Sequence, residues 1–509
     1  MTSALSPPPL AALFLTHFDD IKGQSIIFYM SINSTTLPPK LIEHTTLPSG
    51  LHTLTTDLIP FTHHRLPGIG LFRSRDTSGD GQGGQGQGQG RGRRMGTLGV
   101  VLASPGTVAD LFDIGPFLEK IYDRLEALPL PSYAFEPSPS VATELLEKVF
   151  QEYRAEPPLG LSSLSGPMDI RDLVDGHLHP SANHPITYLP SLLGTLGPSL
   201  IPIYRAALAG RRVLIYSQPP LLPIAAFAWC VWAMSLPPPS ATSSSCAITS
   251  SSEWVGNIGL MDLDEMKSRS GAWIATTSDA IYRLHPASYD IYIDLSSPSS
   301  SSEPTVITSS SSPEPQTITY AFSDLPLYRS LLLLSSSPPS VSVRRAGLWM
   351  IAFELLERVW ALCVGVCDYA IGRGRGNGED YGHGSIRIDG VDDASGERGE
   401  EDARLLDHVD EDTLEEVGEE DQAIRTGRLL LRQLQHDSFH LHARLRAVII
   451  RSAGDGDMLT EAQLRELCGT RWSFFGGSVG GTAEGKWWND LARVWGLTAP
   501  GLARLSDDA

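Results

Sequence analysis

The residues that could carry chemistry are few, and none of them belongs to a complete catalytic set. Gly480, Gly485 and Lys486 have the spacing of a phosphate-binding loop. In such a loop the next residue supplies a hydroxyl group to Mg²⁺, but Trp487 occupies that position and no clear strand comes before the loop. The preferred interpretation is therefore a glycine-rich loop in front of a helix.

Histidine and cysteine pairs are candidate metal ligands, but each pair lacks the further ligands that a site needs. The pairs are His63-His64, His436 and His440, and Cys363 and Cys367. A structural zinc site takes four protein ligands and a catalytic site takes three, so an isolated pair is insufficient. We therefore expect no metal, no cofactor and no covalent catalysis.

Polar residues follow two predicted strands in the middle of the chain. They are Ser217, Gln218, Thr276, Thr277 and Asp279. Loops at strand ends are where a rigid α/β scaffold presents polar groups to a partner. We predict a partner-binding site there, and the alternative is that these loops only cap helices.

A helix, a strand and a second helix are predicted around these loops. Apolar residues from Leu200 to Leu208 have helical spacing, and Gly210 can end that helix in a left-handed conformation. The run Val213 to Tyr216 has the composition of a buried strand. From Leu221 to Met234 no residue is charged. This helix is shorter than the roughly 20 residues that a bilayer requires, so we expect it in the core of a soluble domain and expect no transmembrane segment.

Low-complexity inserts divide the chain into three predicted blocks. Residues 10–155 hold strands and an amphipathic helix, with a hairpin whose turn contains Gly23, and a Gly/Gln insert near 76–94. Residues 184–296 form a second α/β block with a Ser/Pro insert near 237–252. Residues 318–509 are helical, with an acidic insert near 372–421. Such inserts are typical of disordered segments.

Charge and cysteine content limit the class of partner and the compartment. Of the net charge of −20, most lies between Glu379 and Asp421, where 18 acidic residues face three arginines. No concentrated basic surface remains for phosphate contacts, which excludes nucleic acid as a partner. Five cysteines without regular spacing and an N-terminus without a signal-peptide pattern favour the cytoplasm.

The order of these blocks resembles a DENN-domain protein, and within that superfamily it is similar to the LCHN family and its fungal relatives. The matching residues are Phe18-Asp19, Gly23, Ser49 to His52, Asp57, Ile59, Phe61, Gly70 to Phe72, Met95, Gly99-Val100, His184-Pro185, Arg212 to Ser217, Pro219-Pro220, Ala275 to Tyr282 and Tyr289 to Asp294. The match covers residues 10–295, whereas the last block agrees only in its helix order and in the ending WWNDLARVW.

The resemblance implies a longin-like N-terminal module, a central α/β DENN module and a helical C-terminal module. It also implies a guanine nucleotide exchange factor for a Rab-type small GTPase in vesicle trafficking, recruited to endomembranes through its partners. Exchange needs no nucleophile, because the factor only has to bind the nucleotide-free GTPase more tightly than the nucleotide-bound form. A non-catalytic scaffold or adaptor with the same fold is the open alternative.

Overall fold

The computed structural model describes residues 7–19, 23–76, 93–103, 106–128, 141–155, 167–236, 252–296, 305–308, 316–318, 320, 324–335, 419–451, 458–468, 482–495 and 497. The predicted inserts near 76–94, 237–252 and 372–421 lie outside these ranges except at their ends. The insert boundaries were predicted too wide, because Asp76 pairs with Arg93 in two strands and residues 419–421 begin a helix. The sequence predicts a long helix from Leu348 to Tyr369, and this range also lies outside the described residues.

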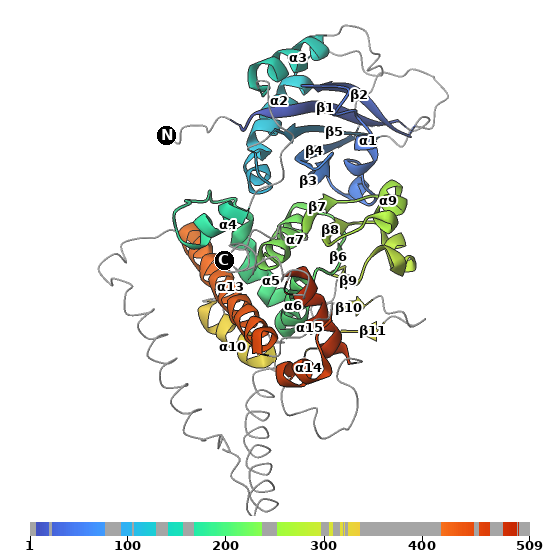
Figure 1. Cartoon of the computed structure of the whole chain (residues 1–509). Helices are drawn as coiled ribbons and strands as arrows, with labels where there is room; N and C mark the ends of the chain where they lie inside the picture. Colours follow the sequence, from blue (N-terminus) through green and yellow to red (C-terminus); the bar gives the residue numbers. More distant parts are fainter. Residues whose placement is uncertain are drawn as a thin grey trace, which may run out of the picture. The chain divides into compact units, whose positions relative to one another are not determined.

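The first half of the described chain forms a five-stranded antiparallel sheet (Figure 1). Its strands are β1 (Leu10–Asp19), β2 (Gly23–Ser31), β3 (Thr56–His63), β4 (Leu66–Asp76) and β5 (Arg93–Leu102), in the order β3-β4-β5-β1-β2. The predicted hairpin is confirmed by the pairing of β1 with β2, and Gly23 takes a φ of +77° at its turn. Every residue from 10 to 15 is buried, because this strand lies between two others and is covered on both faces.

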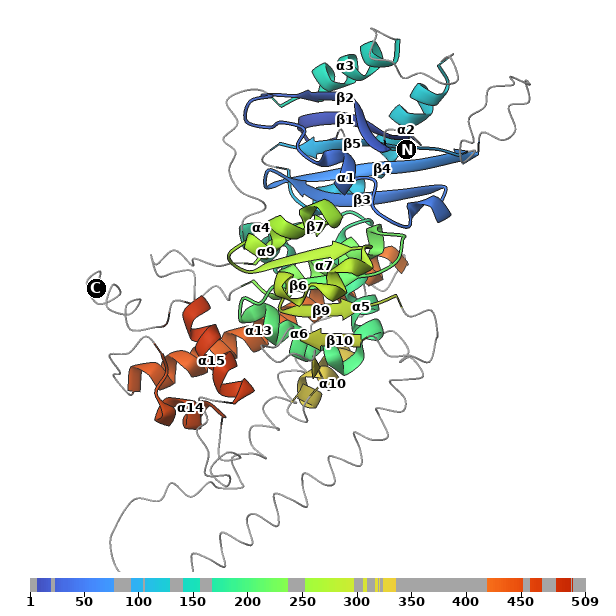
Figure 2. The same ribbon diagram turned by 90° about the vertical axis from the view of Figure 1, so that its right-hand side faces the viewer.

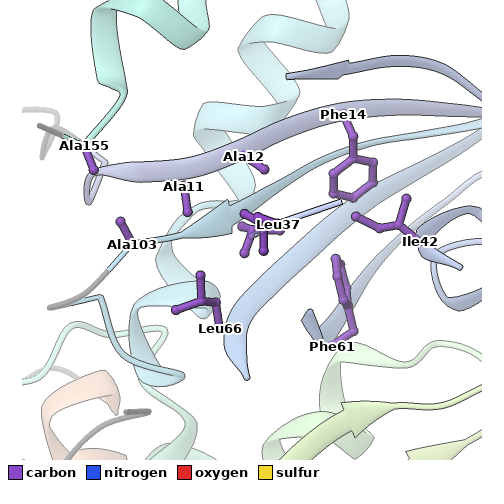
Figure 3. Close-up of a cluster of buried hydrophobic side chains, with 10 residues drawn as sticks. Ala11, Ala12, Phe14, Leu37, Ile42, Phe61, Leu66, Ala103 and Ala155 are labelled. Carbon is purple, nitrogen blue, oxygen red and sulfur yellow. The ribbon is translucent and has the colours of Figure 1, made fainter. Parts of the chain in front are cut away.

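Helices α2 (Gly115–Glu126) and α3 (Val141–Tyr153) pack against this sheet. The predicted amphipathic stripe is observed in α2, where Leu118, Ile121 and Leu125 are buried. Near the short helix α1 (Ile42–Thr45), Phe14 and Phe61 meet edge to face at 5.9 Å in a cluster of buried side chains (Figure 3). Two 3₁₀ turns, η1 (Leu51–Thr53) and η2 (Ala109–Asp113), complete this half.

The second half contains a parallel sheet. Strands β6 (Val213–Tyr216), β7 (Glu253–Asn257), β8 (Trp273–Thr277) and β9 (Ile291–Asp294) are parallel in the order β9-β6-β8-β7. Strands β10 (Thr305–Thr308) and β11 (Gln316–Thr317) extend it in antiparallel fashion beyond β9. The sequence predicts short strands from Trp273 to Thr276 and from Asp290 to Leu295, and β8 and β9 confirm both.

The predicted helix, strand and helix at the centre of the chain are observed as α6 (Leu200–Leu208), β6 and α7 (Leu222–Met234). Gly210 follows α6 with a φ of +71°, as expected for the residue that ends a helix. Every residue of α7 from Ile224 to Met234 is buried. An all-apolar helix of this kind belongs to the core of a domain, as predicted.

Strands β3 and β7 join the two halves into one 11-stranded sheet, and Figure 2 shows these strands side by side. Their registered pair is Phe61 with Gly256, and the Thr62 hydroxyl donates to the Val255 carbonyl at 2.8 Å. The sheet therefore continues from one half to the other through a short contact.

Helices dominate the last part of the chain, as predicted. They are α10 (Leu325–Leu334), α13 (Glu419–Arg451), α14 (Glu461–Cys468) and α15 (Ala483–Val494). Thr460 and Gln463 have the spacing of a capping box in the sequence, which predicts a helix start there. The box is present before α14, because the Thr460 N–H donates to Gln463 Oε1 at 2.7 Å and the Gln463 N–H donates to Thr460 Oγ1 at 3.3 Å. The Tyr204 hydroxyl of α6 donates to the Leu434 carbonyl of α13 at 2.8 Å. The mixed α/β fold with a helical C-terminal region is thus confirmed.

Shorter elements connect these parts. They are α4 (Pro167–Val174), η3 (Pro185–Tyr188), α5 (Leu189–Leu196), η4 (Gly197–Ser199), η5 (Leu260–Asp262), α9 (Leu263–Ser268), η6 (Ala280–Leu284) and η7 (Pro286–Ser288).

Within the described ranges, the one stretch long and apolar enough to cross a membrane is Pro185–Leu208, judged by length and composition. It consists of four successive elements with Gly197 at a φ of +56°. Core helices pass the same test, so this stretch is weak evidence for a span.

Candidate partner-binding site

The two predicted polar loops lie next to each other. Strands β6 and β8 are adjacent and parallel, and their register places Tyr216 beside Thr277. The Ser217 N–H donates to the Thr277 carbonyl at 3.1 Å, so the loops touch directly where the strands end. The carboxyl ends of parallel strands meet at one edge of a sheet, which is why residues 60 positions apart come together.

Most of the predicted binding residues have buried side chains. Thr276 and Thr277 are 0% exposed, and the Thr277 hydroxyl donates to the Ile258 carbonyl at 2.9 Å and accepts from the Asp279 N–H at 3.1 Å. Ser217 and Asp279 are also buried. Gln218 alone of the five has an exposed side chain. Thr276 and Thr277 are the last residues of β8 and not loop residues as predicted. A direct partner contact remains a prediction that rests on Gln218.

A segment of the first half completes this surface. The Ser278 hydroxyl donates to the Ser49 carbonyl at 2.8 Å. Gly50 has a φ of +89°, and a Cβ atom there would lie 3.3 Å from Pro219 Cδ. Residues 49–50 therefore belong beside the strand-end loops. Sequence reasoning placed Ser49 and Gly50 in the resemblance but assigned them no position, because nothing local links them to loops more than 160 residues away.

A buried carboxylate also links the two halves. Asp57 of β3 is 7% exposed, and its Oδ2 accepts from the N–H of Leu221, the N-cap residue that precedes α7, at 2.8 Å. Its Oδ1 accepts from the Leu58 N–H at 2.8 Å. Burial raises the pKa of Asp57 to about 6, and the backbone N–H groups oppose that rise. A carboxylate from the first half therefore satisfies an N–H group at the start of the central helix of the second.

The pKa of Asp57 makes a pH-dependent prediction. Replacing Asp57 by Ala leaves the Leu58 and Leu221 N–H groups without their acceptor, so we expect a loss of about 2 kcal/mol at pH 7. The folded pKa lies above the usual 3.8. The folded state therefore holds the proton more tightly than the unfolded state. This proton-linked stabilisation adds to that of the two hydrogen bonds, is fully present below about pH 4 and is lost as the pH rises to about 6. Urea unfolding of wild type and Asp57→Ala should show a stability gap that narrows across this interval.

The exposed Asp264 provides the control for this experiment, because 97% of its side chain is accessible. The stability gap between wild type and Asp264→Ala should be less than about 0.5 kcal/mol. A gap for Asp57→Ala that does not change with pH would contradict a buried carboxylate at position 57. Asp57→Asn, which keeps one acceptor and does not titrate, separates the proton from the lost hydrogen bond.

Cys363, Cys367 and Gly480 lie outside the described residues, and the other candidate ligands and loop residues can be followed in the structure. The His436 and His440 Nε2 atoms lie 3.2 Å apart on α13, but no group of three or more candidate ligands occurs among the residues that the structure describes. Gly485 and Lys486 lie inside helix α15, whose first turn is capped by Thr482 accepting from the Gly485 N–H at 3.1 Å. The Trp487 indole donates to the Arg205 carbonyl at 2.7 Å, which is a packing role.

Comparison with known proteins identifies sequences that are similar to this chain. The sequence model of the family described as DENN domain-containing protein 11 matches residues 13–305, which include most of β1, strands β2 to β9 and the strand-end loops. A curated relative, the uncharacterized protein ANR2 of Saccharomyces cerevisiae, is 25% identical over 326 residues. That alignment covers 58% of this chain and 59% of the yeast protein, so the chain matches little more than half of the relative's length. Because the family match spans more than half of the sequence, the chain belongs to the DENN domain-containing protein 11 family.

Proposed function

We propose that this protein is a guanine nucleotide exchange factor for a Rab-type small GTPase in intracellular vesicle trafficking. The observation that carries the proposal is the family match over residues 13–305, since DENN domains are generally associated with Rab exchange and trafficking. The protein would act in the cytoplasm and reach endomembranes through its partners. The finer kinship, with the LCHN family, is part of the same proposal.

The first two proposed modules correspond to the two halves of the sheet, and the third is the helical C-terminal region. Residues 10–155 form a longin-like module, and its strand order β2-β1-β5-β4-β3 with two packed helices supports that assignment. Residues 184–296 form the central DENN module, and residues 318–509 form the helical module. The proposed GTPase surface lies at the strand-end loops, because Gln218 is exposed there and residues of both halves meet.

The proposed mechanism needs no bond to be made or broken in the exchange factor. The protein binds the nucleotide-free GTPase more tightly than the nucleotide-bound form, and that difference in affinity accelerates nucleotide release. A tenfold acceleration requires about 1.4 kcal/mol of differential binding. The strand-end loops supply polar groups on a rigid sheet, so little ordering is needed when the partner binds.

Release of a fluorescent GDP analogue, measured over a panel of Rab GTPases, tests the proposal. We expect at least one Rab to respond, and we expect Gln218→Ala to slow its release about tenfold without altering the fold, because surface substitutions cost under about 0.5 kcal/mol of stability. Gln151→Ala is the matched control, since Gln151 is exposed on α3. It should leave the rate unchanged.

Two other outcomes discriminate between hypotheses. Wild-type rates in Gln218→Ala would remove the strand-end loops from the GTPase surface. Binding of a Rab without any acceleration of release would favour the alternative, a scaffold or adaptor with the same fold. Asp279 is a poorer probe than Gln218, because the residue is only 9% exposed.

A further inference from the structure

Helix α13 is the long orange helix in Figure 1, and one of its faces carries a regular stripe of exposed residues. Successive members are separated alternately by four and three residues, which keeps them on one side of the helix. The members of this α13 stripe are Arg425, Leu429, Arg432, His436, Phe439, Ala443, Arg446 and Ile450. The opposite face is buried in the protein through Leu431, Leu434 and Leu445, so the helix is held as a fixed support. From residue 425 to residue 450 it rises by about 37 Å.

The charge of the stripe is opposite to that of the chain as a whole. Arg425, Arg432 and Arg446 are exposed, and no exposed residue from 422 to 451 is acidic. The whole chain has 59 acidic residues against 39 Lys and Arg, so an exposed face without a carboxylate departs from its composition. Within the described ranges, no ion pair joins these three arginines to another residue. The α13 stripe is therefore a local positive surface that an anionic partner can neutralise.

Large apolar side chains lie between these charges. Leu429 is 40% exposed, Phe439 is 45% exposed and Ile450 is 61% exposed. A single exposed apolar side chain is normal on a protein surface, but here all three share one stripe with the arginines. Basic residues together with Phe and Leu are the composition that binds at the boundary between the headgroups and the acyl chains of an anionic bilayer.

Two other kinds of partner fit the stripe less well. A coiled-coil helix needs apolar residues at most positions of this spacing, whereas five of the eight positions hold Arg, His or Ala. A nucleic acid is bound through more phosphate contacts than three arginines supply, and its backbone offers no apolar surface to Phe439 and Ile450. An anionic bilayer is complementary to the charged and the apolar members alike.

We propose that the α13 stripe is a contact surface for an anionic lipid bilayer. The helix lies along the membrane with its arginines at the headgroups and with Leu429, Phe439 and Ile450 at the acyl boundary, while its opposite face stays packed in the protein. Asp421 ends the acidic block, and Arg446 lies about 37 Å further along the helix, well beyond a Debye length of about 8 Å. The contact does not depend on exchange activity, and it is a direct route to membranes beside recruitment through partners.

Flotation of the full-length protein with lipid vesicles tests this proposal. The vesicles consist of phosphatidylcholine with or without phosphatidylserine, each at low and at high salt. Because the chain has a net charge of −20, phosphatidylserine repels it unless a local basic surface faces the membrane. We expect flotation with the phosphatidylserine vesicles at low salt, and weaker flotation at high salt because the attraction is screened. No flotation, or equal flotation with both kinds of vesicle, would overturn the proposal.

Two variants test whether α13 makes the contact. Each arginine near an anionic surface strengthens binding about fivefold, so Arg432→Gln combined with Arg446→Gln should lower vesicle affinity about 25-fold. Phe439→Ser should lower it about fivefold, because less apolar area is buried in the bilayer. All three residues are exposed, so neither variant should move the unfolding midpoint by more than about 2 °C. Wild-type affinity in both variants contradicts the proposal.

Matched substitutions outside the stripe provide the controls. Arg65→Gln combined with Arg283→Gln removes two exposed charges from the β3–β4 turn and from η6, and Leu284→Ser removes an apolar side chain that is 76% exposed. These controls should leave vesicle affinity unchanged. Flotation seen only after deletion of residues 379–418 would mean that the acidic block of this chain occupies the stripe. Binding of polyglutamate without binding of vesicles would indicate an acidic protein partner, and either result overturns the proposal.

Discussion

Replacing Gly256 by Ala should unfold the junction between the two halves and cost more than about 3 kcal/mol. Gly256 has a φ of +74°, where an L side chain is strained by about 1 to 2 kcal/mol. A Cβ atom there would also lie 2.7 Å from Phe61 Cα and 2.8 Å from the Pro60 carbonyl oxygen. Both neighbours are backbone atoms of β3, so the strands themselves must move apart, and backbone strain adds to the steric cost.

Gly271→Ala is the matched control for this result. Gly271 has a φ of +95°, but a Cβ atom there would meet nothing within 4 Å. It should therefore show the conformational cost alone, about 1 kcal/mol. Urea unfolding followed by circular dichroism measures both variants. Equal losses in the two would mean that the β3–β7 contact contributes little to the fold.

Replacing Ile215 by Asp should leave the protein insoluble. Ile215 is 1% exposed in β6, which lies between β8 and β9 and pairs there with Thr276 and Ile293. An unpaired carboxylate at this position costs several kcal/mol, against a typical total stability of about 5 to 15 kcal/mol. The soluble fraction after expression and the unfolding transition of any recovered protein measure the effect.

The control for this change is Leu284→Asp on η6, where the leucine is 76% exposed. It introduces the same carboxylate in the same half of the sheet and should alter stability by less than about 0.5 kcal/mol. A soluble Ile215→Asp variant that unfolds cooperatively near the wild-type midpoint would place β6 outside the core.

The local pattern of the sequence determined the elements around the site. Hydrophobic periodicity, turn residues and helix caps depend on only a few neighbouring residues. The turn at Gly23, the helix end at Gly210 and the capping box of Thr460 and Gln463 were therefore predictable. The apolar run of α7 likewise predicted a buried helix. Two strands followed by polar residues were also predictable, whereas their parallel pairing, which brings Ser217 beside Thr277, came from the structure.

Only the tertiary structure decided which of these residues face solvent and what lies beside them. Thr276 and Thr277 look like exposed loop residues in the sequence, but β7 and its turn cover them. Asp57 meets the Leu221 N–H across 164 residues, and Ser278 meets Ser49 across 229. No local rule predicts such contacts, because they depend on the β3–β7 pairing that joins two separately patterned halves. The hydrogen bonds at the junction of the two halves therefore depend on how distant strands pair, and not on the secondary-structure propensity of each segment.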